Sequence, residues 1–300
     1  MQRMLGKTGI ALSPVGFGCA SVWGNSLISD HDAVKLFEQA YDLGITYYDT
    51  GHSYGMAEER IGKALANRFV PRAKIVLSTK FGTRIVNGKL VHDVSADWIR
   101  ESVRTSLRRM GTDYIDLLSI HGTRRSDFCD EVFSTLAALK QEGLVRAIGA
   151  STSNDAGLIA EIGQNGRFDY VFIRYNLFNR HLEPLMHSLY ENGIGVIAGA
   201  PLAERLYSNR VFLPRSKKDV WYLVRAVARF RKQLLQGRKY RFINHVDGMS
   251  GAQIALRYVL DNEDVSSAVV GTTSLDHLKD DLLALQKEIP ADVLQKIKSI

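Results

Sequence analysis

Short apolar runs alternate along this chain with segments in which apolar residues recur every three or four positions. Eight of the runs, rich in β-branched and aromatic residues, have the length of buried strands. They span residues 15–18, 45–49, 75–80, 114–121, 145–151, 170–175, 196–200 and 268–271. Because strands that alternate with helices usually pair in parallel, this order predicts an α/β protein with a parallel sheet covered by helices.

The segments between the strands begin and end with residues that are typical of helix ends. Asp30 is predicted to cap a helix with apolar positions at Ala33 and Phe37, and Ser95 is predicted to open another. Glycine tolerates the left-handed conformation that ends many helices, and it follows four of the apolar stripes, at Gly44, Gly111, Gly143 and Gly193.

Eight strands with intervening helices and no linker rich in Pro, Gly or Ser favour a single (β/α)8 TIM barrel, with eight parallel strands, over residues 1–300. An open doubly wound sheet is the alternative. A dinucleotide-binding sheet of that kind carries Gly-x-Gly-x-x-Gly after an early strand, and the sequence at Gly16 and Gly18 lacks the third glycine.

The composition is that of a packed globular protein. With 45% hydrophobic and 24% charged residues, the 300-residue chain is predicted to be neither disordered nor fibrous. Cys19 and Cys129 are too few for a disulfide framework or a four-cysteine zinc site, so we expect a reducing compartment and no metal. No stretch reaches the ~18 apolar residues of a membrane span, which predicts a cytoplasmic protein without a membrane partner.

The net charge of +7 is concentrated in one segment. Residues 210–241 hold 11 Lys and Arg against one acid, so they carry +10 and the rest of the chain carries −3. Val220, Val224 and Val227 recur at helical spacing, which favours an amphipathic helix with a basic face in solvent. A single basic helix without clustered aromatic residues does not indicate nucleic-acid binding, and we expect no such partner.

Polar residues stand at the carboxyl ends of the predicted strands, where a barrel places its chemistry. Tyr54 follows the first of them by five positions, and an ammonium beside a phenol lowers the phenol's pKa from its usual value of about 10. Tyr54 and Lys80 are therefore a candidate acid–base pair. The strand-end residues are Asp49, Lys80, His121, Ser151, Tyr175, Asn176, Thr272 and Thr273.

Residues 45–55 (ITYYDTGHSYG), 77–82 (LSTKFG) and 115–121 (IDLLSIH) resemble the aldo-keto reductase family. The resemblance extends over almost the whole chain, from an N-terminal hairpin at residues 5–9 to a C-terminal helix at 275–285. It implies a (β/α)8 barrel with these two additions, and a nicotinamide-dependent oxidoreductase that acts on a small-molecule carbonyl or alcohol.

The family's catalytic tetrad of Asp, Tyr, Lys and His matches Asp49, Tyr54, Lys80 and His121. The resemblance implies that Tyr54 is the general acid and that Lys80, held charged by Asp49, assists it. His121 would then donate a hydrogen bond that places the substrate carbonyl beside the Tyr54 hydroxyl.

The matching nicotinamide pocket departs from the family's usual residues. Ser151 is kept, whereas Thr152, Phe172 and Gly199 stand where an Asn, a Gln and a stacking Tyr are usual. Loss of the ring–ring contact alone costs on the order of 1 kcal/mol. The Gly-Ala-Pro sequence at residues 199–201 resembles that of family branches that act as aldose or pyridoxal dehydrogenases. The implied contacts continue through Ala200, Pro201 and Leu202.

Residues 269–281 (VVGTTSLDHLKDD) resemble the family's adenosine-phosphate loop and the helix after it, and amides at a helix start suit a phosphate. Gly271 and either Thr273 or His277 stand where a Lys and an Arg usually hold a 2′-phosphate. The cofactor is therefore left open between NADP and NAD. The implied contacts here are Gly271, Thr272, Thr273, His277 and Asp281.

The resemblance also implies a basic loop and helix, at residues 203–247, over the cofactor side. Arg205, Arg215 or Lys217 are candidates there to hold cofactor phosphates or an acidic substrate group.

Aromatic residues are candidates to line the substrate mouth, namely Trp23, Phe81, Trp221 and Tyr222. A mouth dominated by apolar residues would favour an aromatic or aliphatic carbonyl. A mouth dominated by polar residues would favour a sugar, and the polar candidates are Asn25, His52, Arg124 and Arg125.

These features together predict an NAD(P)-dependent carbonyl reductase, monomeric or homo-oligomeric. An NAD-dependent aldose-type dehydrogenase that works oxidatively is one alternative. A regulatory or binding protein is another, in which turnover is lost because of Thr152, Phe172 and Gly199. The complete set of four catalytic residues argues against that second alternative.

Overall fold

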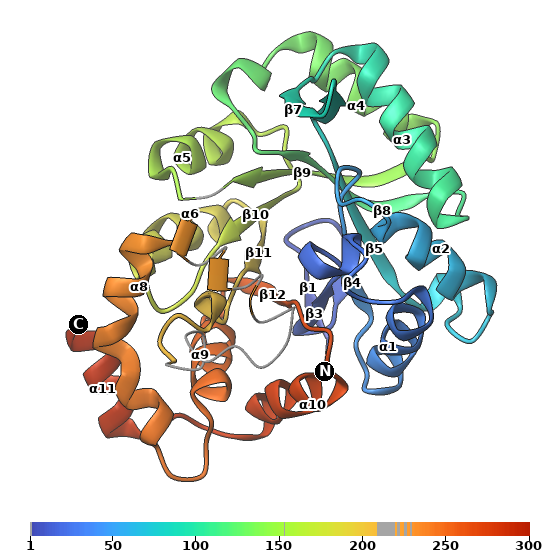
Figure 1. The fold of residues 1–300 in the computed structure, drawn as a ribbon. Helices are drawn as coiled ribbons and strands as arrows, with labels where there is room; N and C mark the ends of the chain where they lie inside the picture. The colour runs from blue at the N-terminus through green and yellow to red at the C-terminus, as the bar shows by residue number, and fades with distance from the viewer. Residues whose placement is uncertain (1, 153, 209–219, 221–222, 225–226, 229) are drawn as a thin grey trace.

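Eight parallel strands close into a barrel in a computed structural model that describes residues 2–152, 154–208, 220, 223–224, 227–228 and 230–300 (Figure 1). Around the barrel the strands follow the order β10-β11-β12-β3-β4-β5-β8-β9, so each strand pairs with its neighbour along the chain. The bounds are β3 (Val15–Gly18), β4 (Tyr47–Asp49), β5 (Val76–Phe81), β8 (Ile115–His121), β9 (Val145–Thr152), β10 (Tyr170–Arg174), β11 (Gly195–Gly199) and β12 (Val265–Val270). The predicted (β/α)8 barrel is confirmed, and the open sheet is excluded.

Helices surround the strands in a ring (Figure 1). They are α1 (Asp30–Asp42), α2 (Ala57–Ala66), α3 (Ala96–Met110), α4 (Asp130–Gln141), α5 (Ala156–Asn165), α6 (Glu183–Glu191), α9 (Gly251–Leu260), α10 (Leu275–Leu282) and α11 (Ala291–Ser299).

The caps of two helices test the predicted helix starts. Ser95 caps α3 as predicted, with its Oγ accepting from Trp98 N, and Gly111 ends that helix in the left-handed conformation. The prediction that Asp30 caps α1 was wrong by one residue. Ser29 is the cap, because its backbone is extended and its Oγ accepts from Asp32 N.

Two antiparallel hairpins add to the barrel. The first, β1 (Arg3–Met4) with β2 (Ala11–Leu12), is the predicted N-terminal hairpin. The second, β6 (Thr83–Val86) with β7 (Lys89–His92), follows β5 and lies near α3 and α4 (Figure 1). Its turn residues Asn87 and Gly88 both have positive φ, at 49° and 75°, as a tight two-residue hairpin turn requires.

Apolar side chains fill one end of the barrel interior. Five of them are fully buried, at 0% exposure, and the three aliphatic ones each contribute roughly 1.5–3 kcal/mol by leaving water. They are Leu12, Tyr47, Leu117, Tyr170 and Ile197. Leu5 of the first hairpin, also at 0%, packs in the same cluster. This end is therefore closed, and the polar strand ends lie at the other.

The segment from 203 to 247 is described in part. Among its described elements are a 3-10 helix at Ala203–Arg205, α8 (Arg231–Gly237) and a second 3-10 helix at Arg238–His245. The Lys296 ammonium of α11 lies 4.3 Å from the Phe242 ring centre. The predicted roles of Arg215, Lys217, Trp221 and Tyr222 lie outside the described residues, as does Arg210, where the basic segment begins.

Three valines of the predicted amphipathic helix are largely exposed. The side chains of Val220, Val224 and Val227 are 49%, 62% and 44% exposed. In the described part of the chain, no helix is long and apolar enough to cross a bilayer.

Candidate active site

An ion pair lies inside the carboxyl end of the barrel. The Nζ atom of Lys80 lies 2.6 and 2.7 Å from the two carboxylate oxygens of Asp49, and it donates to Thr50 O at 2.6 Å. Ser78 Oγ donates to the same carboxylate at 3.0 Å. Asp49 ends β4, and Ser78 pairs with it in register on β5. The side chains of Lys80 and Asp49 are only 2% and 5% exposed, so water barely screens their attraction.

The surroundings keep Lys80 charged. Burial on its own lowers the pKa of Lys80, but the Asp49 carboxylate and the Tyr54 phenol raise it, and the net shift is upward. Lys80 is therefore an ammonium at neutral pH. Its charge lies 5.2 Å from the centre of the Tyr54 ring.

Tyr54 sits on the loop between β4 and α2, and a neighbouring loop holds it there. The Met56 amide donates to Gly24 O at 3.1 Å, and the Tyr54 amide donates to Gly51 O at 2.9 Å. A Cβ at Gly24 would overlap Tyr54 O, and one at Gly55 would overlap Gly24 O. The two backbones therefore approach closely only because glycine stands at both positions.

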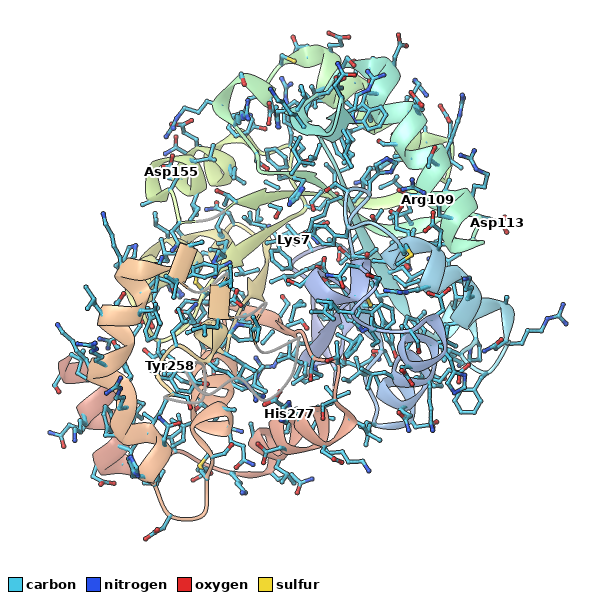
Figure 2. The ribbon with its side chains drawn as sticks, in the orientation of Figure 1. Lys7, Arg109, Asp113, Asp155, Tyr258 and His277 are labelled. Atoms are coloured by element: carbon cyan, nitrogen blue, oxygen red, sulfur yellow. The ribbon has the colours of Figure 1, made fainter. Side chains whose placement is uncertain are left out.

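A second ion pair, with a buried carboxylate and a partly exposed guanidinium, stabilises the same loop. Glu58, at 1% exposure in the first turn of α2, accepts from Thr79 Oγ1 at 2.7 Å and from Arg109 Nη1 at 3.2 Å. Arg109 projects from α3 and also donates to His52 O at 3.2 Å (Figure 2). The loop that carries Tyr54 is thus fixed to β5 on one side and to α3 on the other.

His121 completes the group of four. It ends β8, and its ring meets the ring of Tyr54 edge to face at 5.5 Å and 82°. Burial, together with the charges of Lys80 and His92, lowers the pKa of His121 to about 4. Its imidazole is therefore neutral near pH 7, with one ring nitrogen as donor and the other as acceptor. The structure thus brings together the four residues that the sequence singled out as catalytic.

Phe172 and Gly199 form a close contact beside this group. A Cβ at Gly199 would overlap the Phe172 ring, and the centre of that ring lies 5.0 Å from Lys80 Nζ. The ammonium therefore lies near two aromatic rings, those of Tyr54 and Phe172. Ser151 and Thr152 end β9. Ser151 pairs in register with His121 on one side and with Phe172 on the other, and Thr152 pairs with Ile173, the residue after Phe172.

The loop after β11 carries the next set of predicted cofactor contacts, Ala200, Pro201, Leu202 and Arg205. Four of its residues without the freedom of glycine have φ between 47° and 57°, namely Ala200, Ala203, Glu204 and Arg205. Two ion pairs hold this strained turn: Glu204 with Arg174 at 3.4 Å and Arg205 with Asp281 at 3.3 Å.

The Arg205–Asp281 pair changes the roles predicted for both residues. The Asp281 carboxyl is buried, at 0% exposure, so it faces its partner and not the solvent. Burial raises the pKa of Asp281 to about 6, although Arg205 opposes this shift. A contact between this pair and a cofactor would therefore be made by the guanidinium of Arg205, which Asp281 holds in place.

The loop before α10 is organised by its own hydroxyls. Thr272 Oγ1 accepts from Ser274 N at 3.1 Å, and Ser274 Oγ caps the helix by accepting from His277 N at 3.3 Å. His277 is exposed on α10 (Figure 2), as is Gly271 at the end of β12. Thr273 lies between them, half-buried.

These residues fit a nicotinamide cofactor in their chemistry. Hydroxyls at the end of β9 suit a carboxamide, and amides at the start of α10 suit a phosphate. Ser151 and Thr152 would hold the first group, and the residues from Thr272 to Ser274 the second. Phe172 supplies an aromatic surface beside the ammonium of Lys80.

Trp23 and Phe81, the predicted lining of the substrate mouth, are each 1% exposed. Trp23 and Phe81 belong to the hydrophobic core, where Trp23 meets Phe17 edge to face at 5.6 Å between ring centres. Among the polar candidates, Arg125 is paired with Asp155 and Glu161. Which residues line the mouth stays a prediction.

Comparison with known proteins decides the family. The sequence profile of the aldo/keto reductase family matches residues 14–300. The chain belongs to this family. As a member, it is an oxidoreductase of the aldo-keto reductase type, which works with a nicotinamide cofactor.

Individual relatives cover nearly the whole chain. L-galactose dehydrogenase of Arabidopsis thaliana is 32% identical over 94% of this chain and 87% of its own length. The NADH-specific methylglyoxal reductase of Escherichia coli is 29% identical over 94% of this chain and 92% of its own length. The holo form of an aldo-keto reductase from Bacillus halodurans has a TM-score of 0.81 and 30% identity, covering 99% of this chain and 95% of its own.

The structure adds residues that the sequence analysis missed. Ser78 lies two positions before Lys80, so strand alternation places both on one face, and this signal was available. Thr83 contacts His121, with Oγ1 at 3.0 Å from Nδ1. No spacing rule predicts that contact, because a hairpin turns the chain between β5 and α3.

Proposed function

We propose that this protein reduces an aldehyde or ketone by transfer of a hydride from NADH or NADPH, with Tyr54 as the general acid. The observation that carries the proposal is the arrangement of Tyr54, with a buried ammonium 5.2 Å from its ring and a neutral imidazole at its edge. The ammonium of Lys80 and the neutral imidazole of His121 have the charge states that carbonyl reduction needs.

The protein's residues act on the proton and on the carbonyl oxygen. The reduced nicotinamide, when bound, supplies the hydride to the carbonyl carbon. Tyr54 donates its phenolic proton to the oxygen, so an alcohol forms and a phenolate remains. Lys80 stabilises that phenolate, and Asp49 keeps Lys80 charged and in place.

His121 acts on the substrate and not on the proton. Because its imidazole is neutral, it can donate one N–H to the carbonyl oxygen without adding a positive charge beside Lys80. That hydrogen bond holds the oxygen near the Tyr54 hydroxyl and strengthens as negative charge develops on it. After the product leaves, the phenolate takes up one proton from solvent, which restores Tyr54 for the next turnover.

The test is turnover of a panel of carbonyl compounds by the wild type and by Tyr54→Phe. We expect the wild type to consume NADH or NADPH with at least one carbonyl, and Tyr54→Phe to lose roughly a hundredfold or more of that rate. Equal, slow consumption by both proteins would contradict the catalytic role. Quenching of tryptophan fluorescence by either cofactor separates a catalytic failure from a failure to bind.

For the cofactor we propose that NADH and NADPH both serve. The cations that typically hold a 2′-phosphate are replaced at Gly271 and at Thr273 or His277, and His277 is exposed. The similarity to an NADH-specific reductase supports the use of NADH. A preference of about a hundredfold for either cofactor in kcat/KM, or about 2.7 kcal/mol, would contradict dual use.

A second function, oxidation of an aldose with NAD, is favoured by one comparison. The relative with 32% identity is a sugar dehydrogenase. The two functions share the same residues, since Tyr54 as phenolate would accept the alcohol proton in the reverse direction. Initial rates with a panel of sugars plus NAD, set against the carbonyl panel plus NADH, distinguish them.

A further inference from the structure

One ring nitrogen of His121 is engaged by a residue of the second hairpin. Thr83 Oγ1 lies 3.0 Å from His121 Nδ1. Thr83 is the first residue of β6, three positions after Lys80, and Gly82 between the strands has φ of 91°. This turn directs the hairpin across the end of β8, where His121 stands. The other ring nitrogen, Nε2, is left to face away from Thr83.

The opposite strand of the hairpin is anchored to the same part of the barrel. Thr83 is paired in register with His92 of β7, and His92 Nε2 lies 2.8 Å from Asp127 Oδ1. Asp127 is 1% exposed, and its other oxygen accepts from Arg124 N at 2.8 Å. The base of the hairpin is thus held by contacts with His121 on one strand and Asp127 on the other. Thr83 consequently has a defined position relative to His121.

The direction of the Thr83–His121 hydrogen bond decides what His121 can do. A neutral imidazole has one N–H and one lone pair on its two nitrogens. If Thr83 donates its hydroxyl hydrogen to Nδ1, the ring proton is on Nε2, which can then donate to a carbonyl oxygen. If Thr83 accepts from Nδ1, the lone pair of Nε2 would face that oxygen and repel it.

We propose that Thr83 is a positioning residue that donates its hydroxyl hydrogen to Nδ1 of His121 and so keeps the ring proton on Nε2. The benefit of this tautomer for catalysis rests on the proposed carbonyl reduction, in which His121 is a donor. The tautomer itself is a property of the protein alone.

The test compares three substitutions in the full-length chain. Thr83→Val removes the hydroxyl and keeps the shape, whereas Thr83→Ser keeps the hydroxyl. Thr135→Val is the matched control, because Thr135 is buried in α4, at 6% exposure, and its hydroxyl donates to Glu131 O of its own helix. His121→Gln identifies the signals of His121 among the eight histidines.

The first readout is the nitrogen and proton NMR spectrum of protein labelled with ¹⁵N-histidine, at neutral pH. We expect wild type, Thr83→Ser and Thr135→Val to show His121 protonated on Nε2, and Thr83→Val to lose this preference. Protonation of His121 on Nδ1 in the wild type would overturn the proposal, and so would an unchanged tautomer in Thr83→Val. The wild-type measurement stands even if a variant fails to fold.

The second readout is kcat/KM with a carbonyl substrate. We expect Thr83→Val to lose about tenfold or more, and Thr83→Ser to recover most of it, since a misplaced donor to the oxygen is costly. If the tautomer shifts as expected but no carbonyl is turned over by the wild type, the role of Thr83 stands and the proposed function fails. If the wild type turns over and the tautomer does not respond to Thr83→Val, only the role of Thr83 fails.

Discussion

The ring of Phe172 fills the space above Gly199 so closely that a methyl group on Gly199 would overlap it. Phe172 belongs to β10 and Gly199 to the neighbouring β11, and the register pairs Gly199 with Arg174, two residues beyond Phe172. Because Gly199 of β11 has no side chain, the ring of Phe172 from β10 can occupy the space beside Lys80. Phe172 and Gly199, which stand where the family usually has a Gln and a Tyr, are thus coupled to each other.

This coupling predicts that Gly199→Ala weakens cofactor binding and that a second substitution restores it. The added methyl displaces the Phe172 ring toward Lys80, and such overpacking typically costs about 1–3 kcal/mol. We expect the Kd for NADH, measured by quenching of tryptophan fluorescence, to rise about tenfold in Gly199→Ala. In Gly199→Ala with Phe172→Leu it should fall back toward that of Phe172→Leu alone. Additive effects of the two substitutions would show that the residues are independent.

Lys80→Met is expected to lower stability as well as activity. Removal of one partner from a buried ion pair leaves the Asp49 carboxylate without compensation, which costs about 3–5 kcal/mol. Urea denaturation measures this loss, and Asp49→Asn with Lys80→Met should recover part of it. Lys63→Met is the control, because Lys63 pairs with Asp30 at the surface with its side chain 58% exposed. A loss at Lys63 as large as that at Lys80 would contradict the argument from burial.

The residues at the strand ends were predictable because a barrel has one chemical face. Asp49, Lys80 and His121 each end an apolar run, and closure of eight strands brings these ends together whatever the loops do. Tyr54 stands on a loop five positions after a strand end, so closure of the barrel alone does not place it beside Lys80, and the resemblance to known sequences was needed to support its role. Its position depends on the close approach of Gly24 and Gly55, which no periodicity encodes.

Other parts of the site depend on contacts between distant residues. Arg205 and Asp281 are 76 positions apart, and sequence reasoning treated each as a separate cofactor contact. The hairpin that carries Thr83 was also missed, although Asn87-Gly88 is a strong signal for a tight turn. Its strands expose apolar side chains, Ile85 at 61% and Leu90 at 70%, so a search for buried runs passes over them.

The pKa of His121 predicts a pH dependence of stability. Because it is lowered from 6.5 to about 4, the native state resists a proton that the unfolded chain accepts. The stabilisation is complete above pH 6.5 and is lost as the pH falls toward 4, by up to about 3 kcal/mol. Asp281, with its pKa raised to about 6, acts in the opposite direction, since ionisation of this carboxyl opposes folding as the pH rises from 4 to 6.

The two effects are separated by comparing variants. We expect the free energy of unfolding of His121→Gln, from urea titrations between pH 4 and 7, to fall less steeply with decreasing pH than that of the wild type. Asp281→Asn should instead make the fall steeper, because the opposing group is gone. Parallel curves for the wild type and His121→Gln would show that His121 is protonated in the native state at its ordinary pKa.

Arg60 holds the loop between β3 and α1 in place through several hydrogen bonds. Its side chain, 2% exposed, donates to the carbonyl oxygens of Trp23, Asn25 and Ile28 and pairs with Asp30. A lysine keeps the charge but lacks the planar fork that reaches several acceptors. Arg60→Lys is therefore expected to leave at least one buried carbonyl without a donor and to destabilise the protein by about 1–3 kcal/mol.

The same loop supplies Gly24, which contacts the backbone of Tyr54, so Arg60→Lys should also lower kcat with a carbonyl substrate. Arg100→Lys is the matched control, because Arg100 is on the surface of α3 and pairs with a half-exposed Glu142. We expect that variant to keep the stability and kcat of the wild type within a factor of about two. A fall in stability without any fall in kcat for Arg60→Lys would show that the loop does not position Tyr54.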